Sequence, residues 1–405
     1  TADGGGSCVP ALMRVASAAK SRASGAAPSR SSSLPAASGI AVVVTSFVPE
    51  FGSSRTVTAD GGGHYVVERM PVGGVLATAQ TAQLIGEARG QLTVDGQTLT
   101  LDILLESNIV TLPATLADGN GSDYTVVGSG RLEGGFRSVF NGTNAANRGS
   151  ANLVITRDGV PEAFAGSAFG TYEGQRREIA IRQDALQGLS VVRKVFVPAT
   201  GYFTRHLELL TNPTAIDITV DVQVVSNYRM PFCCSVELAA TGSGDRAVTA
   251  ADRWVVLDDF DDADPQDVFN APPVAYVLSG AGALMAPQDI AYQDFGNRVA
   301  QLAVTWQQVT IPAGQTVALM HFTAQQVNKA GAIATAQRLE TLPPEALDGL
   351  SAGEIAAIRN FVVPADGVGT VEPLPVLTGT VSGTVFEGDG TTPVQDATLN
   401  LVSSS

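Results

Sequence analysis

Short runs of alternating apolar and polar residues recur along most of the chain, and this period of two constrains the fold more than any other feature. Successive side chains of a β-strand point to opposite faces, so such runs are typical of half-buried strands. The candidate strands are residues 91–94, 98–105, 124–128, 151–156, 177–182, 189–197, 203–210, 216–226, 253–257, 274–278, 298–309 and 316–324. Turn residues separate these runs, which predicts a large antiparallel β-sandwich.

The composition agrees with a mostly β chain of more than one domain. A length of 405 residues suits two or three domains, and 44% hydrophobic residues are enough to form sizeable cores. The 43 glycines and 21 prolines favour many short elements joined by turns. One helical region stands out at 343–361, where Ser351 followed by Glu354 has the spacing of a capping box. We expect two short helices there and at 327–339, packed on the edge or end of the sandwich.

Charge and cysteine content narrow the choice of partners and compartment. The net charge of −15 repels phosphate backbones, so nucleic acid is excluded as a partner. No apolar run approaches the roughly 18 residues of a membrane span. The odd cysteine count of Cys8, Cys233 and Cys234 suggests a free or intermolecular thiol in a secreted chain. A vicinal 233–234 disulfide, a bridge to Cys8 and buried reduced thiols all stay open.

Composition shifts divide the chain into six segments. We expect a low-complexity linker or arm, the second half of a small sandwich, a large β-sandwich, a helical segment packed on it, a Pro-rich linker, and the first strands of another small sandwich. In that order the segments are 1–38, 39–82, 83–326, 327–363, 364–377 and 378–405.

The two ends carry halves of one recognisable pattern. The last segment contains Gly383, Val385, Asp389, Gly390, Pro393, Val394, Asp396, Ala397, Leu399 and Leu401, with a turn between two alternating runs. It resembles the first half of a carboxypeptidase regulatory-like, immunoglobulin-like domain. Residues 58–73 (TADGGGHYVVERMPVG) resemble the second half, in which Tyr65 anchors the sandwich. The second half precedes the first, as in a tandem array cut out of phase, or in a subunit whose end strands complete a neighbour's sheet.

The central domain has a resemblance of its own. Residues 188–212 (GLSVVRKVFVPATGYFTRHLELLTN), continuing to 226, are similar to strands of the large β-sandwiches of the galactose mutarotase-like type. That resemblance implies a carbohydrate-related domain, but it lies in the pattern of strands and not in catalytic residues.

Candidate sites are few. The acidic run 258–267 (DDFDDADPQD) predicts either a solvated loop or a calcium site formed by Asp258, Asp261 and Asp264, and calcium is the one cofactor considered. The loop 118–123 (DGNGSD) has calcium-loop spacing, but we interpret it as a tight turn. The histidines His64, His206 and His321 form no catalytic motif. A glycosidase-like pair could come only from Glu173, Glu178, Glu208 or Asp217.

These patterns predict a non-enzymatic structural subunit or repeat of an extracellular bacterial fibre, sheath or adhesin. Copies would join head-to-tail by β-strand complementation. The polymerisation strands are represented by Thr384, Val385, Phe386, Ala397, Leu399 and Leu401 in one unit and by Val43 and Val66 in the next. The alternative is a secreted carbohydrate-binding or carbohydrate-processing protein, which needs exposed aromatics such as Trp254, Tyr276, Tyr292 or Trp306 to stack on a glycan.

Overall fold

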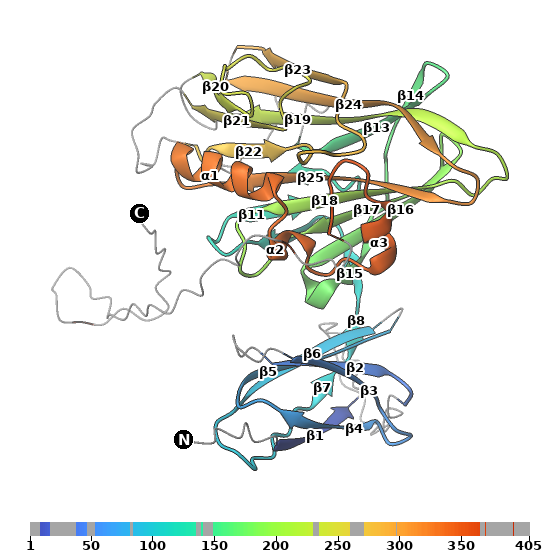
Figure 1. Cartoon of the computed structure of the whole chain (residues 1–405), viewed down its shortest axis with the longest axis vertical. Helices are drawn as coiled ribbons and strands as arrows, with labels where there is room; N and C mark the ends of the chain where they lie inside the picture. Colours follow the sequence, from blue (N-terminus) through green and yellow to red (C-terminus); the bar gives the residue numbers. More distant parts are fainter. Residues whose placement is uncertain are drawn as a thin grey trace.

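The computed structural model describes two β-sandwiches of different size (Figure 1). The described residues are 9–16, 38–46, 53–81, 84–134, 139–140, 149–229, 235–259, 271–296 and 298–364, with 369 and 392. The chain is mostly β, as the alternating runs predict. No helix in these ranges is long and apolar enough to cross a membrane. The predicted disulfide candidates Cys8, Cys233 and Cys234 lie outside them, as do nearly all of 364–405.

The small sandwich, drawn in blue in Figure 1, consists of two sheets with the strand orders β3-β2-β5-β6-β8 and β4-β1-β7. Its strands are β1 (Val9–Ala16), β2 (Ala41–Ser46), β3 (Ser53–Thr58), β4 (His64–Met70), β5 (Gly73–Gln80), β6 (Leu84–Leu92), β7 (Ile103–Leu104) and β8 (Glu106–Ser107). Val44, Val67 and Met70 lie in its core. Tyr65 is buried there too and donates a hydrogen bond to the Leu101 carbonyl, in keeping with the anchoring role that the resemblance implies.

This sandwich extends beyond the segment 39–82 that the sequence suggested. β1 lies within the expected arm and pairs with β4 and β7, while β6 lies in the segment assigned to the large sandwich and pairs with β5. β5 and β6 pair with each other as far as Gln80 and Ile85, on either side of the boundary expected at residue 83, so both strands belong to the small sandwich. Gly86 brings β6 close to β7, because a side chain at this position would collide with the Leu104 carbonyl.

The large sandwich packs a nine-stranded sheet against a five-stranded sheet. The nine strands are, in order, β20 (Val236–Thr241), β21 (Trp254–Asp259), β22 (Val274–Val277), β25 (Thr316–Gln325), β18 (Thr204–Thr211), β17 (Leu189–Phe196), β16 (Glu178–Leu186), β15 (Phe169–Glu173) and β9 (Ile109–Thr111). The five are β14 (Val160–Ala163), β13 (Asn152–Arg157), β19 (Ile218–Arg229), β24 (Val299–Ile311) and β23 (Asp289–Asp294). A small third sheet joins β10 (Ala114–Ala117), β11 (Asp123–Val126) and β12 (Leu132–Glu133).

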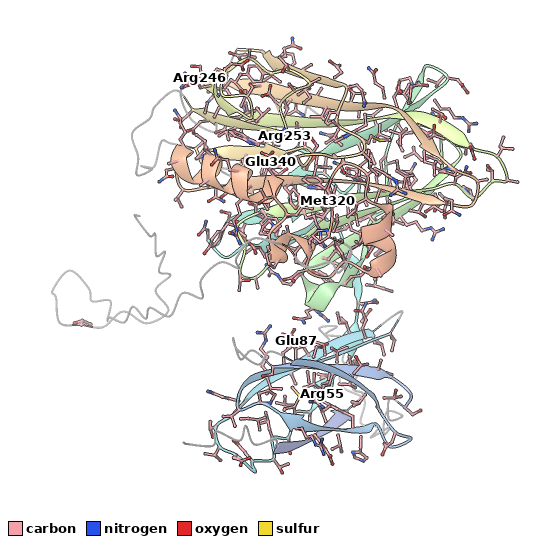
Figure 2. All side chains as sticks on the ribbon, viewed as in Figure 1. Arg55, Glu87, Arg246, Arg253, Met320 and Glu340 are labelled. Carbon is pink, nitrogen blue, oxygen red and sulfur yellow. The ribbon has the colours of Figure 1, made fainter. Side chains whose placement is uncertain are left out.

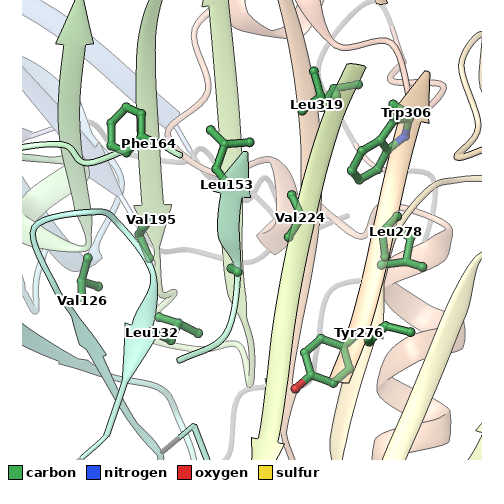
Figure 3. Packing of buried hydrophobic residues seen from close by; sticks show 14 of the residues in the cluster. Val126, Leu132, Leu153, Phe164, Val195, Val224, Tyr276, Leu278, Trp306 and Leu319 are labelled. Carbon is green, nitrogen blue, oxygen red and sulfur yellow. The ribbon is translucent and has the colours of Figure 1, made fainter. Parts of the chain in front are cut away.

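All pairings within these three sheets are antiparallel, as predicted. Leu153, Val224 and Trp306 belong to the core between the two large sheets, shown from close by in Figure 3.

Helices form a third layer on the outer face of the nine-stranded sheet. They are α1 (Lys329–Glu340), α2 (Pro344–Leu347) and α3 (Ala352–Ala357), and α1 contacts β21, β22 and β25. Ser351 and Glu354 form the predicted capping box of α3. The expected place of the helices, at an edge or end of the sandwich, is wrong. The central strands are buried on both faces, and residues such as Leu207 and Met320 pack against the helices.

Candidate functional site

Four ionisable side chains meet inside the large sandwich. Arg193 of β17 forms a two-pronged ion pair with Glu208 of β18, with Nε donating to Oε2 at 2.8 Å and Nη2 to Oε1 at 2.7 Å. His321 of β25 lies 3.1 Å from Glu208 Oε1 through its Nε2. The His206 ring stacks on that of His321, with the centroids 4.8 Å apart. All four side chains are buried, so the cluster has no route to solvent through its own atoms.

The electrostatics of this interior cluster fix its charge state. Burial opposes ionisation of Glu208, but the Arg193 charge and the hydrogen bonds from His321 and Arg193 outweigh it and lower the pKa to about 2. Burial also lowers the pKa of His206 and His321 below the ordinary value of 6.5, so both rings are neutral near pH 7. The cluster is therefore one ion pair with two neutral imidazoles.

Backbone groups close this interior cluster. Arg193 donates its remaining hydrogen bonds to the carbonyls of Ser129 and Ala151, at 2.7 and 2.8 Å. Its guanidinium also lies over the Phe164 ring, 5.6 Å from the centroid. With these partners each nitrogen of the Arg193 guanidinium donates at least one hydrogen bond inside the protein. The geometry supports a role in fixing the packing of the sandwich.

A second charged cluster lies on the opposite face of the same sheet, beneath α2 and α3. Arg205 of β18 donates to Glu178 at 2.9 Å and to the α2 carbonyl of Ala346 at 2.8 Å. Lys194 of β17 forms ion pairs with Glu173 and with Glu354 of α3. These contacts tie the helices to the sheet.

Of the four carboxylates considered for glycoside chemistry, Glu173 and Glu178 lie together, because they stand opposite each other on β15 and β16 and both form ion pairs with Lys194. The other two lie elsewhere. Glu208 faces the core, Glu173 and Glu178 face the helical layer, and Asp217 accepts a hydrogen bond from the Ala313 amide. No pair of them shares an open cleft in the described part of the chain.

Most of the aromatic residues named for the carbohydrate alternative are buried. Trp254, Tyr276 and Trp306 are all buried, and Tyr292 is half-buried against the core. Trp306 and Tyr276 belong to the core between the two large sheets, while Trp254 packs beneath the helical layer. The expectation that these rings are exposed is wrong for these three, because the layers cover both faces of the nine-stranded sheet.

The acidic candidates behave as structural residues where they are described. Asp258 is buried at the end of β21 and accepts a hydrogen bond from the Asp259 amide, whereas Asp261 and Asp264 lie outside the described residues. Across the described ranges, no three His, Cys, Asp or Glu side chains are grouped to hold a metal. The 118–123 loop forms the predicted tight turn, in which Asp118 accepts hydrogen bonds from the amides of Asn120 and Ser122.

Open grooves occur on both sandwiches. One of about 710 Å³ lies on the large sandwich, where α3 and the residues after it line it with Ile355, Phe361 and Val362 among others. Another lies on the small sandwich. β3 ends one sheet and β4 ends the other, and the two edge strands lie next to each other. The groove between them has a volume of about 550 Å³ and is lined by Arg55, Thr56, Val57, Val66, Val67, Glu68 and Arg69. We call it the β3–β4 groove. Val66 is 43% exposed in it, and Figure 2 labels Arg55 on this sandwich.

The backbone at the β3–β4 groove also has free hydrogen-bonding groups. β3 pairs with β2 through an unbroken register from Ala41–Thr58 to Ser46–Ser53. In an antiparallel pair alternate residues direct their N–H and C=O groups away from the partner. Ala59 bonds to Ile40, so this alternation directs the groups of Thr56 and Thr58 outward. Among the described residues β3 has no second neighbour. It is therefore an edge that can accept another strand.

The structure separates the two predicted acceptor residues. Val66 lies on edge strand β4 and lines the groove. Val43 lies in β2, which pairs with β3 on one side and β5 on the other, so its backbone is already engaged. The donor residues Thr384, Val385, Phe386, Ala397, Leu399 and Leu401 lie outside the described ranges. Arg55 and Arg69 were not predicted as functional residues, although charged residues on Ser/Thr-rich runs are a known mark of edge strands.

Comparisons with known proteins add little to this geometry. No protein-family model matches the chain, including the regulatory-like domain that the ends resemble, and no curated protein matches it. A polysaccharide lyase is 11% identical with a TM-score of 0.32, over 57% of this chain and 34% of the lyase. The chain thus spans about a third of that protein.

Two further solved structures are similar over more of their length. A Klebsiella pneumoniae protein assigned as an aldose 1-epimerase is 12% identical with a TM-score of 0.31, over 68% of this chain and 87% of that one. A Synechocystis sp. PCC 6803 protein is 11% identical with a TM-score of 0.25, over 63% and 93%. Scores this low carry no argument about activity.

Proposed function

We propose that this chain is a structural subunit or repeat of an extracellular bacterial assembly, such as a fibre, sheath or adhesin. Units join when a strand from one copy adds to the small sandwich of the next. The observation that carries this proposal is the β3–β4 groove, where a regular strand with one unpaired edge lies beside the exposed Val66 and the half-buried Val57. Strand addition supplies backbone hydrogen bonds for affinity and side-chain pockets for specificity.

The donor in this proposal is the segment 378–405, whose two alternating runs are 384–386 and 397–402. A donor at one end and an acceptor near the other give a head-to-tail contact that uses different surfaces on the two copies. Such contacts do not close on themselves unless the geometry forms a ring, so they build filaments.

The buried charged side chains of the large sandwich support this proposal. Arg193 and Arg205 form buried ion pairs with glutamates of the same sheet, and Lys194 pairs with Glu354 of α3, which ties this helix to the sheet. The carbohydrate alternative needs exposed rings on this sandwich, and three of the four rings named for it, Trp254, Tyr276 and Trp306, are buried. We therefore assign the large sandwich a scaffolding role.

The test is a truncation series measured by sedimentation velocity and negative-stain electron microscopy. The full chain is expected to assemble into linear particles as its concentration rises, while a variant lacking 378–405 stays a folded monomer. A variant lacking only 403–405 keeps both alternating runs and is the matched control, expected to assemble like the full chain. Assembly that survives loss of 378–405, or a full chain that stays monomeric, would contradict the proposal.

A further inference from the structure

We infer that β3 is the accepting edge and that residues 397–402 of a second copy form the added strand, guided by Arg55 and Arg69. This inference rests on the proposed function and names the partner of the same groove. It depends on three features of the described residues: the regularity of β3, the pattern of side chains in the groove, and the charge at its rim.

The two edges of the groove differ in regularity. β3 keeps one register with β2 along all six residues. β4 carries a bulge, because Glu68 and Arg69 stand opposite a single residue of β1, and Arg69 has a left-handed φ of 60°. Bulges interrupt the ladder and are a common way of protecting an edge from pairing. A strand entering the groove therefore finds a continuous ladder only on β3.

The run 397–402 (ATLNLV) matches β3 in length. Both have six residues, which span about 20 Å in an extended strand. Ala397, Leu399 and Leu401 share one face, and beside β3 this face would lie next to Arg55 and Val57 and near Val66. The opposite face carries Thr398, Asn400 and Val402 next to the exposed Thr56 and Thr58, so two of its three residues are polar.

Charge favours this donor over other segments of an acidic chain. The net charge of −15 makes two copies repel each other. The groove presents Arg55 and Arg69, which form no ion pair with any described residue, against one acid, Glu68. The segment 378–405 carries Glu387, Asp389 and Asp396 and no Lys or Arg, and Asp396 directly precedes the run. Attraction between these groups would steer the encounter and weaken as salt is added.

A charge-swap experiment tests the pairing in the full chain. Arg55→Glu with Arg69→Glu reverses the groove, and Glu387→Lys with Asp389→Lys and Asp396→Lys reverses the donor. Either set alone is expected to slow assembly by about tenfold or more at low salt. Both sets in one chain restore the attraction, because each copy supplies a groove and a donor. Arg89→Glu on β6, an exposed arginine away from the groove, is the matched control and should assemble normally.

A second pair of variants tests the edge itself. Thr56→Pro removes an outward N–H that β3 offers to a donor, and proline is tolerated on edge strands. Thr56→Val keeps that N–H. Loss of assembly with Thr56→Pro alone supports β3 as the acceptor.

Two results would overturn the inference. One is a double swap no faster than either half, and the other is equal assembly of the Thr56→Pro and Thr56→Val variants. If assembly still requires 378–405 in that case, the proposed function stands and only the assignment of β3 and 397–402 fails.

Discussion

The two sandwiches of this chain differ in the burial and pairing of their charged side chains. In the large sandwich Arg193 and Glu208 are almost completely buried, with side-chain exposures of 1% and 0%, and they form an ion pair with each other. In the small sandwich Arg55 and Arg69 lie exposed at the rim of a groove and pair with no described residue. Buried pairs fix how layers pack, whereas exposed charges beside an open edge are available to a partner. In our proposal the large sandwich is the scaffold and the small one the joint.

The largest effect on stability is expected from a substitution that removes one partner of the buried Arg193–Glu208 ion pair. Glu208→Ala leaves Arg193 charged and unpaired in the core, which should lower the free energy of unfolding by about 3–5 kcal/mol. Glu237→Ala removes a partner of the exposed Arg246 and should cost less than about 1 kcal/mol. Urea unfolding followed by tryptophan fluorescence measures both, because Trp254 and Trp306, the only tryptophans, lie in the large sandwich. Equal losses would mean that the buried pair does not hold the scaffold.

A core truncation in the small sandwich tests whether the two bodies are separable. Met70 is fully buried there, and Met70→Ala should cost about 2–5 kcal/mol. We expect faster hydrogen exchange in β2 to β6 and loss of assembly, while the urea midpoint reported by tryptophan fluorescence stays unchanged. A matching fall in that midpoint would show that the sandwiches unfold together.

The stability of the large sandwich should depend on pH through its buried ionisable side chains. His206 and His321 have pKa values below the ordinary 6.5 when folded, so the unfolded chain binds protons first and stability falls as pH drops below about 6.5. Glu208, with its pKa lowered from 4.5 to about 2, adds a further loss between those values. Asp118 acts in the opposite sense, because burial raises its pKa to about 6.

The His206→Phe variant isolates one proton of this dependence. Neither ring nitrogen of His206 has a hydrogen-bond partner of ordinary geometry. The nearby Gly130 backbone raises the pKa of His206, but by less than any other group that acts on it. Stability at pH 7.5 should therefore hold or rise. Below pH 6 the slope of stability against pH should fall by about 1.4 kcal/mol per unit. Urea titrations at several pH values measure it, and an unchanged slope would contradict a neutral, buried His206.

Much of the fold follows from the sequence, because the alternating runs in 124–324 coincide with strands and Ser351 with Glu354 caps a helix. The extent of the small sandwich near residue 83 could not be predicted, because composition does not show that β5 and β6 pair with each other. Arg193 and Arg205 lie in alternating runs and look like surface charges. Their burial depends on layers contributed by residues far away in sequence, such as Ala151 and Ala346. The alternation of a run predicts on which face of its strand a side chain lies, but not which other elements of the chain cover that face.

For the candidate site, the sequence indicated strand complementation and the β4 residue Val66, whereas the regular edge belongs to β3, because β4 carries a bulge. Val43 has the same alternation as an edge residue, yet β2 is central in its sheet. Which strand of a sheet is left unpaired depends on the order of strands, and the alternation of a single run carries no information about that order.

The most direct measurement is photo-cross-linking between copies, with p-benzoylphenylalanine at position 56 of β3. Unlabelled chains carrying the probe are mixed with uniformly ¹⁵N-labelled chains, assembled and irradiated, and cross-linked peptides are identified by mass spectrometry. Our account predicts cross-links from position 56 to labelled peptides that contain residues 397–402. Cross-links confined to peptides of the same copy, or to labelled peptides from other parts of the chain, would contradict strand addition at β3.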